Sequence, residues 1–144
     1  MREFGTAFEY ELPANSFSIF GFISGVKVDL IHYHHPLIEK PISFDGIRLI
    51  SIQDIAAMKM NAILGGGQKK DFFDMDVLIE KFSLQEIFGF YSYKYPNQML
   101  AVSLPQALVY FEDAEESENP ISLNSRTWGM VKSHLREKVR GFLC

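Results

Sequence analysis

The sequence predicts an α+β protein in which strands come first and helices follow. Strand-forming residues and tight-turn dipeptides fill roughly the first fifty positions, and capped helical patterns fill the rest. The chain has 144 residues, 47% of them hydrophobic, which is ample for a core. We expect a strand-rich part at 1–50 and a helical region at 51–144 that continues it within one domain.

The first part reads as short strands joined by tight turns. Phe8, Tyr10 and Leu12 alternate with polar neighbours, as they do in a half-buried strand. Ser24-Gly25 and Asp45-Gly46 are dipeptides that favour two-residue hairpins. Strands are therefore predicted over 8–12, 17–23, 26–33, 42–44 and 47–49.

From Ser51 onward, apolar residues recur at helical spacing. Ser51 with Asp54 predicts a helix start, and Gly65-Gly66-Gly67 predicts its end. Ser83 with Glu86 forms a second capping box. Helices are predicted over 51–64, 70–82, 83 to 90 or 91, 99–111 with an interruption near Leu104-Pro105, and from Asn124 or Thr127 onward.

The block from Lys59 to Asp74 carries the most informative chemistry. Lys59 lies on the apolar stripe of its helix, while Asp71 and Asp74 lie one turn apart on the next helix. Because the connection is short, an antiparallel pair of helices places Lys59 level with Asp74 or Met75, and a contact of Lys59 with Asp74 is predicted. Charged groups among apolar side chains are costly unless paired. Two interpretations stay open: a structural ion pair, and a site in which Lys59 holds a phosphate and the acids orient it.

The glycine-rich connection adds weight to the phosphate interpretation. Backbone amides at a loose glycine turn before a helix favour anions, so Gly66 and Gly67 are candidate phosphate-binding residues. Lys69 and Lys70 add positive charge there. The segment is not a Walker A loop, because it follows a helix and no Ser or Thr follows the lysines.

Asp29 is the other candidate acid, in the middle of a predicted strand. Lys27 lies two residues earlier on the same face. The pair fits an edge strand with a solvated face, and Asp29 also fits a carboxylate that binds a metal or acts as a base in phosphoryl transfer. His32 and His34 would share a strand face, but a zinc site lacks further ligands because the single cysteine is Cys144.

Composition excludes several classes of protein. No run of apolar residues is long enough for a transmembrane helix, and the N-terminus has no signal-peptide pattern, so a cytoplasmic location is expected. The formal charge is −4, and the acidic run at 112–118 is predicted to be a solvated loop. The last helix is basic, but its apolar stripe indicates that it docks on the body by one face. The stripe consists of Trp128, Val131, Leu135 and Val139.

Five segments together carry a resemblance to a known family. They are 26–31 (VKVDLI), 46–63 (GIRLISIQDIAAMKMNAI), 69–74 (KKDFFD), 110–115 (YFEDAE) and 128–132 (WGMVK). In combination they resemble the AbiEii/AbiGii toxin family of nucleotidyltransferase-like proteins, often the toxin half of bacterial toxin–antitoxin or abortive-infection systems. The resemblance implies a partial polymerase-β-like nucleotidyltransferase core followed by a helical bundle.

The resemblance also implies roles for individual residues. Asp29 would be the strand carboxylate and a metal ligand, Lys59 would bind the nucleotide phosphates, and Asp71 and Asp74 would be the paired catalytic acids. Lys70 stands where that motif carries a basic residue. The family further implies Mg²⁺, a nucleoside triphosphate, an RNA acceptor and an antitoxin partner. The arginine that usually precedes the motif is replaced here by a glycine-rich loop.

One departure from the family pattern decides what activity we expect. The family's Gly-Ser turn and metal-binding Asp-x-Asp pair are missing, since positions 1–24 contain no aspartate. Two-metal phosphoryl transfer needs that pair. We therefore expect a truncated protein that is catalytically incomplete alone. The alternatives are a non-catalytic module that forms a homodimer or binds an antitoxin through an uncovered strand edge, and an enzyme completed in trans by a separate N-terminal piece.

Overall fold

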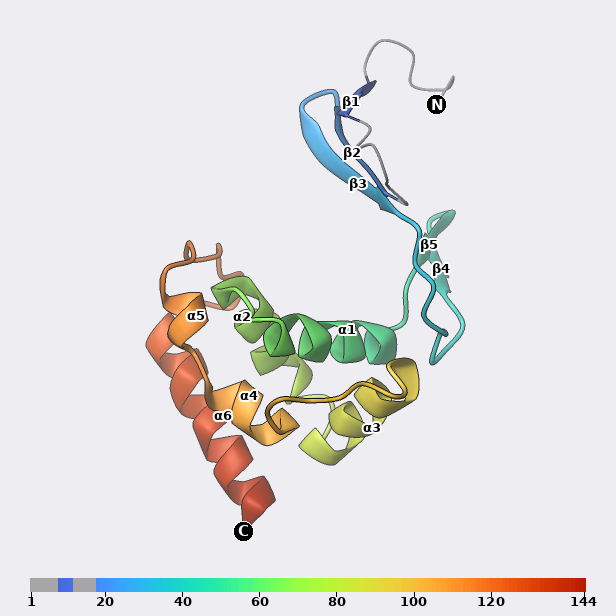
Figure 1. Cartoon of the computed structure of the whole chain (residues 1–144). Helices are drawn as coiled ribbons and strands as arrows, with labels where there is room; N and C mark the ends of the chain where they lie inside the picture. The colour runs from blue at the N-terminus through green and yellow to red at the C-terminus, as the bar shows by residue number, and fades with distance from the viewer. Residues whose placement is uncertain (1–7, 12–17) are drawn as a thin grey trace. The chain divides into compact units, whose positions relative to one another are not determined.

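The computed structural model describes residues 8–11 and 18–144. The chain divides into two compact units, Met1–His35 and Pro36–Cys144. The described strands come before the helices along the chain (Figure 1), so the α+β class with strands first is confirmed. The division falls after residue 35 instead of after residue 50, because the second hairpin is grouped with the helices.

The first unit contains a three-stranded antiparallel sheet. Its strands are β1 (Phe8–Glu11), β2 (Ser18–Ile23) and β3 (Val26–Ile31), in the order β1-β2-β3. The predicted turn is confirmed, since Ser24 and Gly25 have φ of +49° and +80°, the positive values that a two-residue hairpin requires. Leu12 and Phe17, which were also expected in strands, lie outside the described residues. Among those residues β3 pairs only with β2, so it is an edge strand.

The second unit begins with a hairpin and continues with helices. Strands β4 (Ile42–Phe44) and β5 (Ile47–Leu49) pair across Asp45-Gly46, as predicted. The helices that follow are α1 (Ile52–Leu64), α2 (Lys69–Leu78), α3 (Leu84–Lys94), α4 (Leu104–Val109), α5 (Glu112–Glu115) and α6 (Trp128–Leu143). Within the described part of the chain, none of these helices has the length and apolar character needed to cross a bilayer.

The core of this unit forms around α1, which contacts α2, α3 and α4 (Figure 1). Met60 of α1 and Met75 of α2 are fully buried. Helix α6 closes the core with its predicted stripe, of which Val131, Leu135 and Val139 are buried and Trp128 is partly buried. Helix α1 begins at the predicted cap, where Ser51 Oγ accepts a hydrogen bond from the backbone N–H of Asp54. The local patterns therefore identified the elements that carry the candidate site.

Several predicted boundaries were wrong. Strand β3 ends at Ile31 instead of residue 33, and α3 continues to Lys94 instead of ending at residue 90 or 91. Helix α2 ends at Leu78 instead of Phe82, and a turn follows it. The predicted helix over 99–111 is only Leu104–Val109, because Pro105 occupies its first turn, where proline is favoured, and starts the helix instead of interrupting it. The acidic run is not a loop throughout, since Glu112–Glu115 form the single turn of α5.

Candidate functional site

The ammonium group of Lys59 lies between two carboxylates of α2. Its Nζ is 3.0 Å from Asp71 Oδ1 and 2.6 Å from Asp74 Oδ2. The predicted Lys59–Asp74 contact is confirmed, and Asp71 joins it. The side chain of Lys59 is 25% exposed. Burial lowers the pKa of Lys59, but the hydrogen bonds with Asp74 and Asp71 outweigh burial and raise the pKa above its ordinary value of 10.5.

The two carboxylates are held differently. Asp71 is 11% exposed, and its second oxygen accepts a hydrogen bond of 2.9 Å from the backbone N–H of Gln68, which caps the start of α2. Asp74 is 53% exposed, and within the described part of the chain Lys59 is its one ion-pair partner. Asp71 is therefore fixed by the backbone, whereas Asp74 can turn away from Lys59 without breaking another bond.

The glycine-rich connection ends α1 through its own amides. The N–H of Gly66 donates to Ile63 O at 3.1 Å and that of Gly67 to Ala62 O at 3.0 Å. Gly66 has φ of +98°, so these two hydrogen bonds form a Schellman motif, the helix C-cap that requires a residue in the left-handed conformation. Phosphate binding by Gly66 and Gly67 stays a prediction. It requires these amides to break their hydrogen bonds with the carbonyl groups of Ile63 and Ala62.

The two neighbouring lysines lie in different surroundings. Lys69 is buried, and its backbone N–H donates to Ser117 Oγ at 2.9 Å while its Nζ donates to Ser117 O at 2.8 Å. It therefore anchors the segment after α5. Lys70 is exposed and forms no ion pair with any described residue. Of the two ammonium groups, that of Lys70 is the one open to a ligand.

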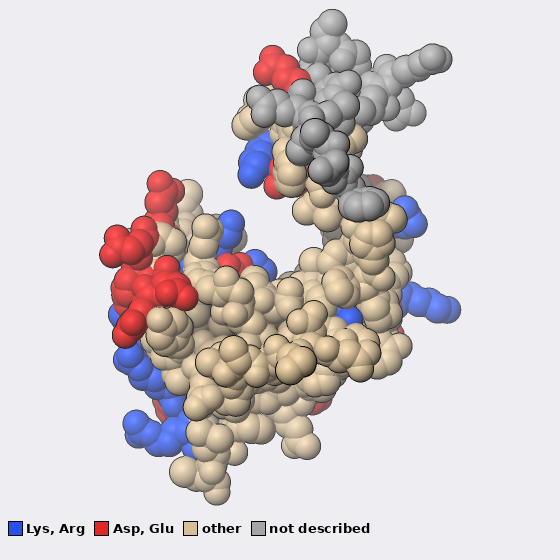
Figure 2. Space-filling view, in the orientation of Figure 1, with Lys and Arg blue, Asp and Glu red and all other residues tan. Residues whose placement is uncertain are grey.

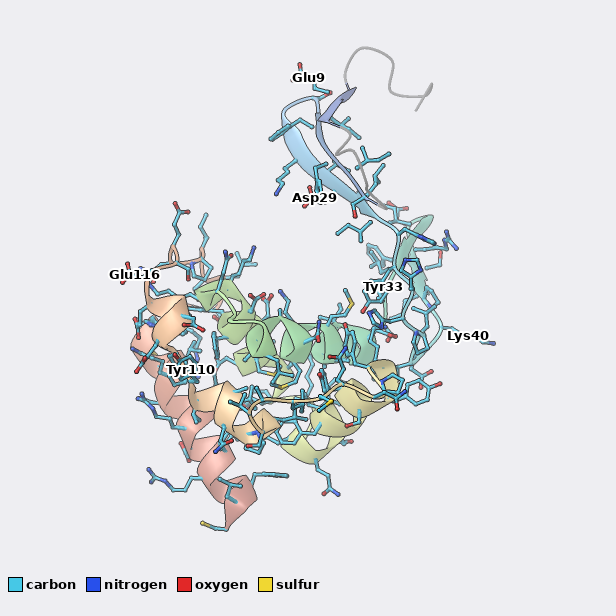
Figure 3. All side chains as sticks on the ribbon, viewed as in Figure 1. Glu9, Asp29, Tyr33, Lys40, Tyr110 and Glu116 are labelled. Atoms are coloured by element: carbon cyan, nitrogen blue, oxygen red, sulfur yellow. The ribbon has the colours of Figure 1, made fainter. Side chains whose placement is uncertain are left out.

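Asp29 belongs to the first unit, and Lys59, Asp71 and Asp74 belong to the second. Asp29 lies on β3 (Figure 3), and its Oδ2 is 3.5 Å from Lys27 Nζ. Both side chains are exposed, as the interpretation of a solvated edge strand requires. Among the described residues, no group of three or more histidine, cysteine or acidic side chains is placed to hold a metal ion.

A buried ion pair elsewhere was not anticipated. Lys94 at the end of α3 donates from Nζ to Asp54 Oδ1 at 2.5 Å, and both side chains are 0% exposed. Asp54 also accepts bonds from Ser51 Oγ and from the backbone N–H of Ile38. Burial raises the pKa of Asp54, but these donors, Lys94 foremost, outweigh it and lower the pKa below its ordinary value of 3.8.

A second unanticipated cluster joins α2 to α6. Arg126 forms a two-pronged pair with Asp76, with Nε–Oδ2 and Nη2–Oδ1 distances of 2.8 Å each. His134 of α6 places Nδ1 2.6 Å from Asp76 Oδ1 and Nε2 3.0 Å from Glu80 Oε1. Asp76 is buried. The sequence carried one signal for this cluster, since Asp76 lies four residues after the buried Phe72 and therefore shares its face of α2.

Comparison with known proteins identifies one similar sequence without assigning a function. The chain is 35% identical to an uncharacterized protein of Aquifex aeolicus (strain VF5) over 126 residues, which cover 84% of this chain and 59% of that protein. The chain thus spans about three fifths of the length of that relative. No protein-family model matches the chain. No solved structure gives a significant match.

Proposed function

We propose that this chain is a nucleotidyltransferase-fold protein of the AbiEii/AbiGii toxin type, in which Lys59 binds the phosphates of a nucleotide. The observation that carries the proposal is the placement of Lys59 Nζ within 3.0 Å of both Asp71 and Asp74. A cation held at the surface by one fixed and one releasable carboxylate can exchange the releasable partner for a phosphate oxygen. The proposal extends, through the family, to an RNA acceptor and an antitoxin partner.

The described residues do not make up a two-metal site. Asp29 is the strand carboxylate to which the resemblance assigns a metal, and it pairs with Lys27. One exposed carboxylate does not supply the ligands that two Mg²⁺ ions need against a triphosphate. We therefore assign no step through Mg²⁺ to these residues, and we expect that this polypeptide alone binds a nucleotide without transferring it.

The absence of transfer is tested with the purified chain. It is incubated with Mg²⁺, each labelled nucleoside triphosphate and tRNA, and the RNA is then separated by electrophoresis. We expect no labelled RNA. A labelled product that depends on Lys59, and is lost in Lys59→Met, would show that the chain is complete as an enzyme.

Phosphate binding is tested separately with inorganic tripolyphosphate, followed by calorimetry. Lys59→Met should abolish measurable binding. Asp74→Asn should tighten it severalfold, because the variant removes a negative charge that competes for the same ammonium. Glu137→Gln, an exposed change of equal charge on α6, is the matched control and should have little effect. Equal affinity in Asp74→Asn and Glu137→Gln would contradict the exchange of carboxylate for phosphate.

A specific observation also favours the interaction module. The β4–β5 hairpin carries four large apolar side chains on one face, because Ile42 pairs with Leu49 and Phe44 with Ile47. All four are exposed, Phe44 by 71%. A two-stranded hairpin is marginally stable alone, and an uncovered apolar face marks an interaction site. We infer that a second copy of the chain covers this face.

Light scattering over a range of concentrations tests this second candidate. A dimer is expected for the native chain, and Phe44→Lys should convert it to a monomer. Met99→Lys, which changes another highly exposed apolar residue outside the hairpin, should leave the dimer intact. A native chain that stays monomeric at high concentration would exclude self-association through the hairpin and leave the face to an antitoxin.

A further inference from the structure

An open groove runs along the solvent face of α2, next to the Lys59 cluster. One wall is the helical stripe of Lys70, Phe73, Asp74 and Val77. The other wall is the segment 116–124, which two clamps hold against α2. In the first clamp, at the start of α2, Lys69 Nζ donates a hydrogen bond to Ser117 O. In the second, near the end of α2, Arg126 Nε donates a hydrogen bond to Asp76 Oδ2. Because both ends are tied to α2, the groove is part of the fold.

The groove has an apolar part and an acidic part. The apolar part has a volume of about 360 Å³, within the range of small-ligand sites. Its lining includes Phe73, Asp74, Val77, Ile121, Leu123 and Asn124. Ile121 and Leu123 are 93% and 99% exposed, so their apolar surfaces face solvent although they come from a clamped segment. Such surface is available to a planar apolar ligand.

The charged residues around the groove determine whether a charged or an uncharged part of a ligand can bind in it. The neighbouring part has a volume of about 440 Å³ and contains Lys70 together with Glu116 and Glu118. Figure 2 shows acidic side chains gathered over α5, and Figure 3 places Glu116 beside it. Among the described residues neither Glu116 nor Glu118 forms an ion pair, so two unneutralised carboxylates oppose an anionic group in this part. At Lys59, by contrast, both carboxylates are ion-paired. The groove therefore suits the uncharged portion of a ligand.

Asp74 connects the groove to Lys59. Its side chain lines the apolar part, while its Oδ2 lies 2.6 Å from Lys59 Nζ. We propose that the apolar part of the groove binds the base of a nucleotide, that Asp74 accepts hydrogen bonds from the ribose hydroxyls, and that the phosphates extend to Lys59. This inference rests on the proposed function and adds to it the site of the base.

The groove residues supply the contacts that a base requires. Phe73 offers an aromatic ring, and base–aromatic stacking contributes to affinity without depending on which base is bound. At the rim, Ser122 Oγ donates a hydrogen bond to Asn124 Oδ1 and so holds that amide in place. The amide nitrogen of Asn124 is a donor that can reach the edge of a base. Phe73 stacks on Trp128, with ring centres 6.1 Å apart and planes 13° apart. Trp128 is the single tryptophan of the chain, so its fluorescence reports on the groove.

The test separates the base from the phosphates by using adenosine, guanosine, cytidine, uridine and tripolyphosphate as separate probes. At least one nucleoside should bind and change the Trp128 emission. Val77→Glu and Leu123→Glu should each weaken that binding at least tenfold. Their matched controls are Met130→Glu, an equally exposed helical position, and Met99→Glu, an equally exposed loop position. Neither control should change the affinity for the nucleoside.

The outcomes distinguish this inference from the proposed function. Lys59→Met should weaken tripolyphosphate binding and leave nucleoside binding unchanged. If tripolyphosphate binds through Lys59 while no nucleoside binds, or while the groove variants bind nucleosides as the native chain does, the base site is refuted and the phosphate site stands. If a nucleoside binds in the groove and tripolyphosphate does not bind, the base site stands and the proposed role of Lys59 is refuted.

Discussion

Replacing Lys94 by methionine should destabilise the helical unit more than the loss of any exposed ion pair. Methionine keeps most of the apolar stem of Lys94 and removes the ammonium that bonds Asp54 at 2.5 Å and Pro36 O at 2.9 Å. Both members of the pair are fully buried. Removing one member of a buried pair leaves an uncompensated charge and costs about 3–5 kcal/mol.

The structure places the expected cost at the lower end of that range. After the change Asp54 keeps hydrogen bonds from Ser51 Oγ and from the N–H groups of Ile38 and Glu39, so its charge is not left bare. We therefore expect a loss of about 3 kcal/mol. At about 4 °C per kcal/mol for a unit of this size, the midpoint of thermal unfolding should fall by about 12 °C.

Far-ultraviolet circular dichroism during heating measures this shift, and urea unfolding gives the free energy. Lys138→Met is the matched control, because Lys138 pairs with Glu80 at 3.5 Å and both side chains are exposed. Its loss should cost no more than about 0.5 kcal/mol. If Lys94→Met lowers the midpoint no further than this control does, the buried pair does not hold the helices together as described.

Three further changes test other parts of the argument by urea unfolding. Gly66→Ala should cost about 1–2 kcal/mol, because φ of +98° strains any residue with a Cβ. Gly89→Ala is the control: it is exposed in the middle of α3 with open space around it and should gain about 0.5–1 kcal/mol. A Gly66→Ala variant as stable as the native chain would contradict the capping role of Gly66. Asp71→Ala should cost about 1–2 kcal/mol through the lost cap, and Asp71→Asn should recover part of it, since an amide oxygen can still accept from the backbone. Stability should also depend on pH at both extremes. The pKa of Asp54 is lowered in the folded protein, so its stabilising contribution is present above pH 3.8 and is lost as the pH falls through the folded pKa. The pKa of Lys59 is raised, so its contribution is present below pH 10.5 and is lost as the pH rises through the folded pKa. The Lys59→Met variant should lose the part of the alkaline dependence that comes from Lys59 and keep the part from Tyr91, whose pKa burial raises above 10.0. An alkaline dependence that is unchanged in the variant would assign all of it to other groups.

Features fixed by near neighbours in the chain could be predicted. The serine caps at Ser51 and Ser83 depend on residues three positions away, and both are present in the structure. The turns at Ser24-Gly25 and Asp45-Gly46 depend on two residues each. The contact of Lys59 with Asp74 followed because a short connection leaves two packed helices few ways to align.

Features that depend on distant residues could not be predicted in the same way. Asp54 and Lys94 are forty positions apart, and Asp54 was interpreted only as part of a cap. A signal for Lys94 was nevertheless present, since it continues the buried spacing of Leu84, Ile87 and Tyr91 on α3. A lysine on such a stripe needs a buried acid, but nothing local says which one.

The pairing of Arg126 with Asp76 was beyond local reasoning for a different reason. Arg126 lies in an irregular segment, and its partner is fifty positions away on α2. Periodicity carries no information about such a segment. The sequence patterns therefore did not predict the groove that this pairing helps to form, although they predicted the helices α2 and α6.

The anchoring of residues 36–39 affects how the helical half can be studied in isolation. Helix α1 opens at Ile52, which invites a shortened polypeptide that starts at its serine cap. Such a polypeptide would discard the main-chain carbonyl of Pro36 and the amides of Ile38 and Glu39, which surround the buried charges. A version that starts at Pro36 keeps this set together, so the stretch ahead of the first helix functions as a structural part of the helical half and not as a dispensable leader.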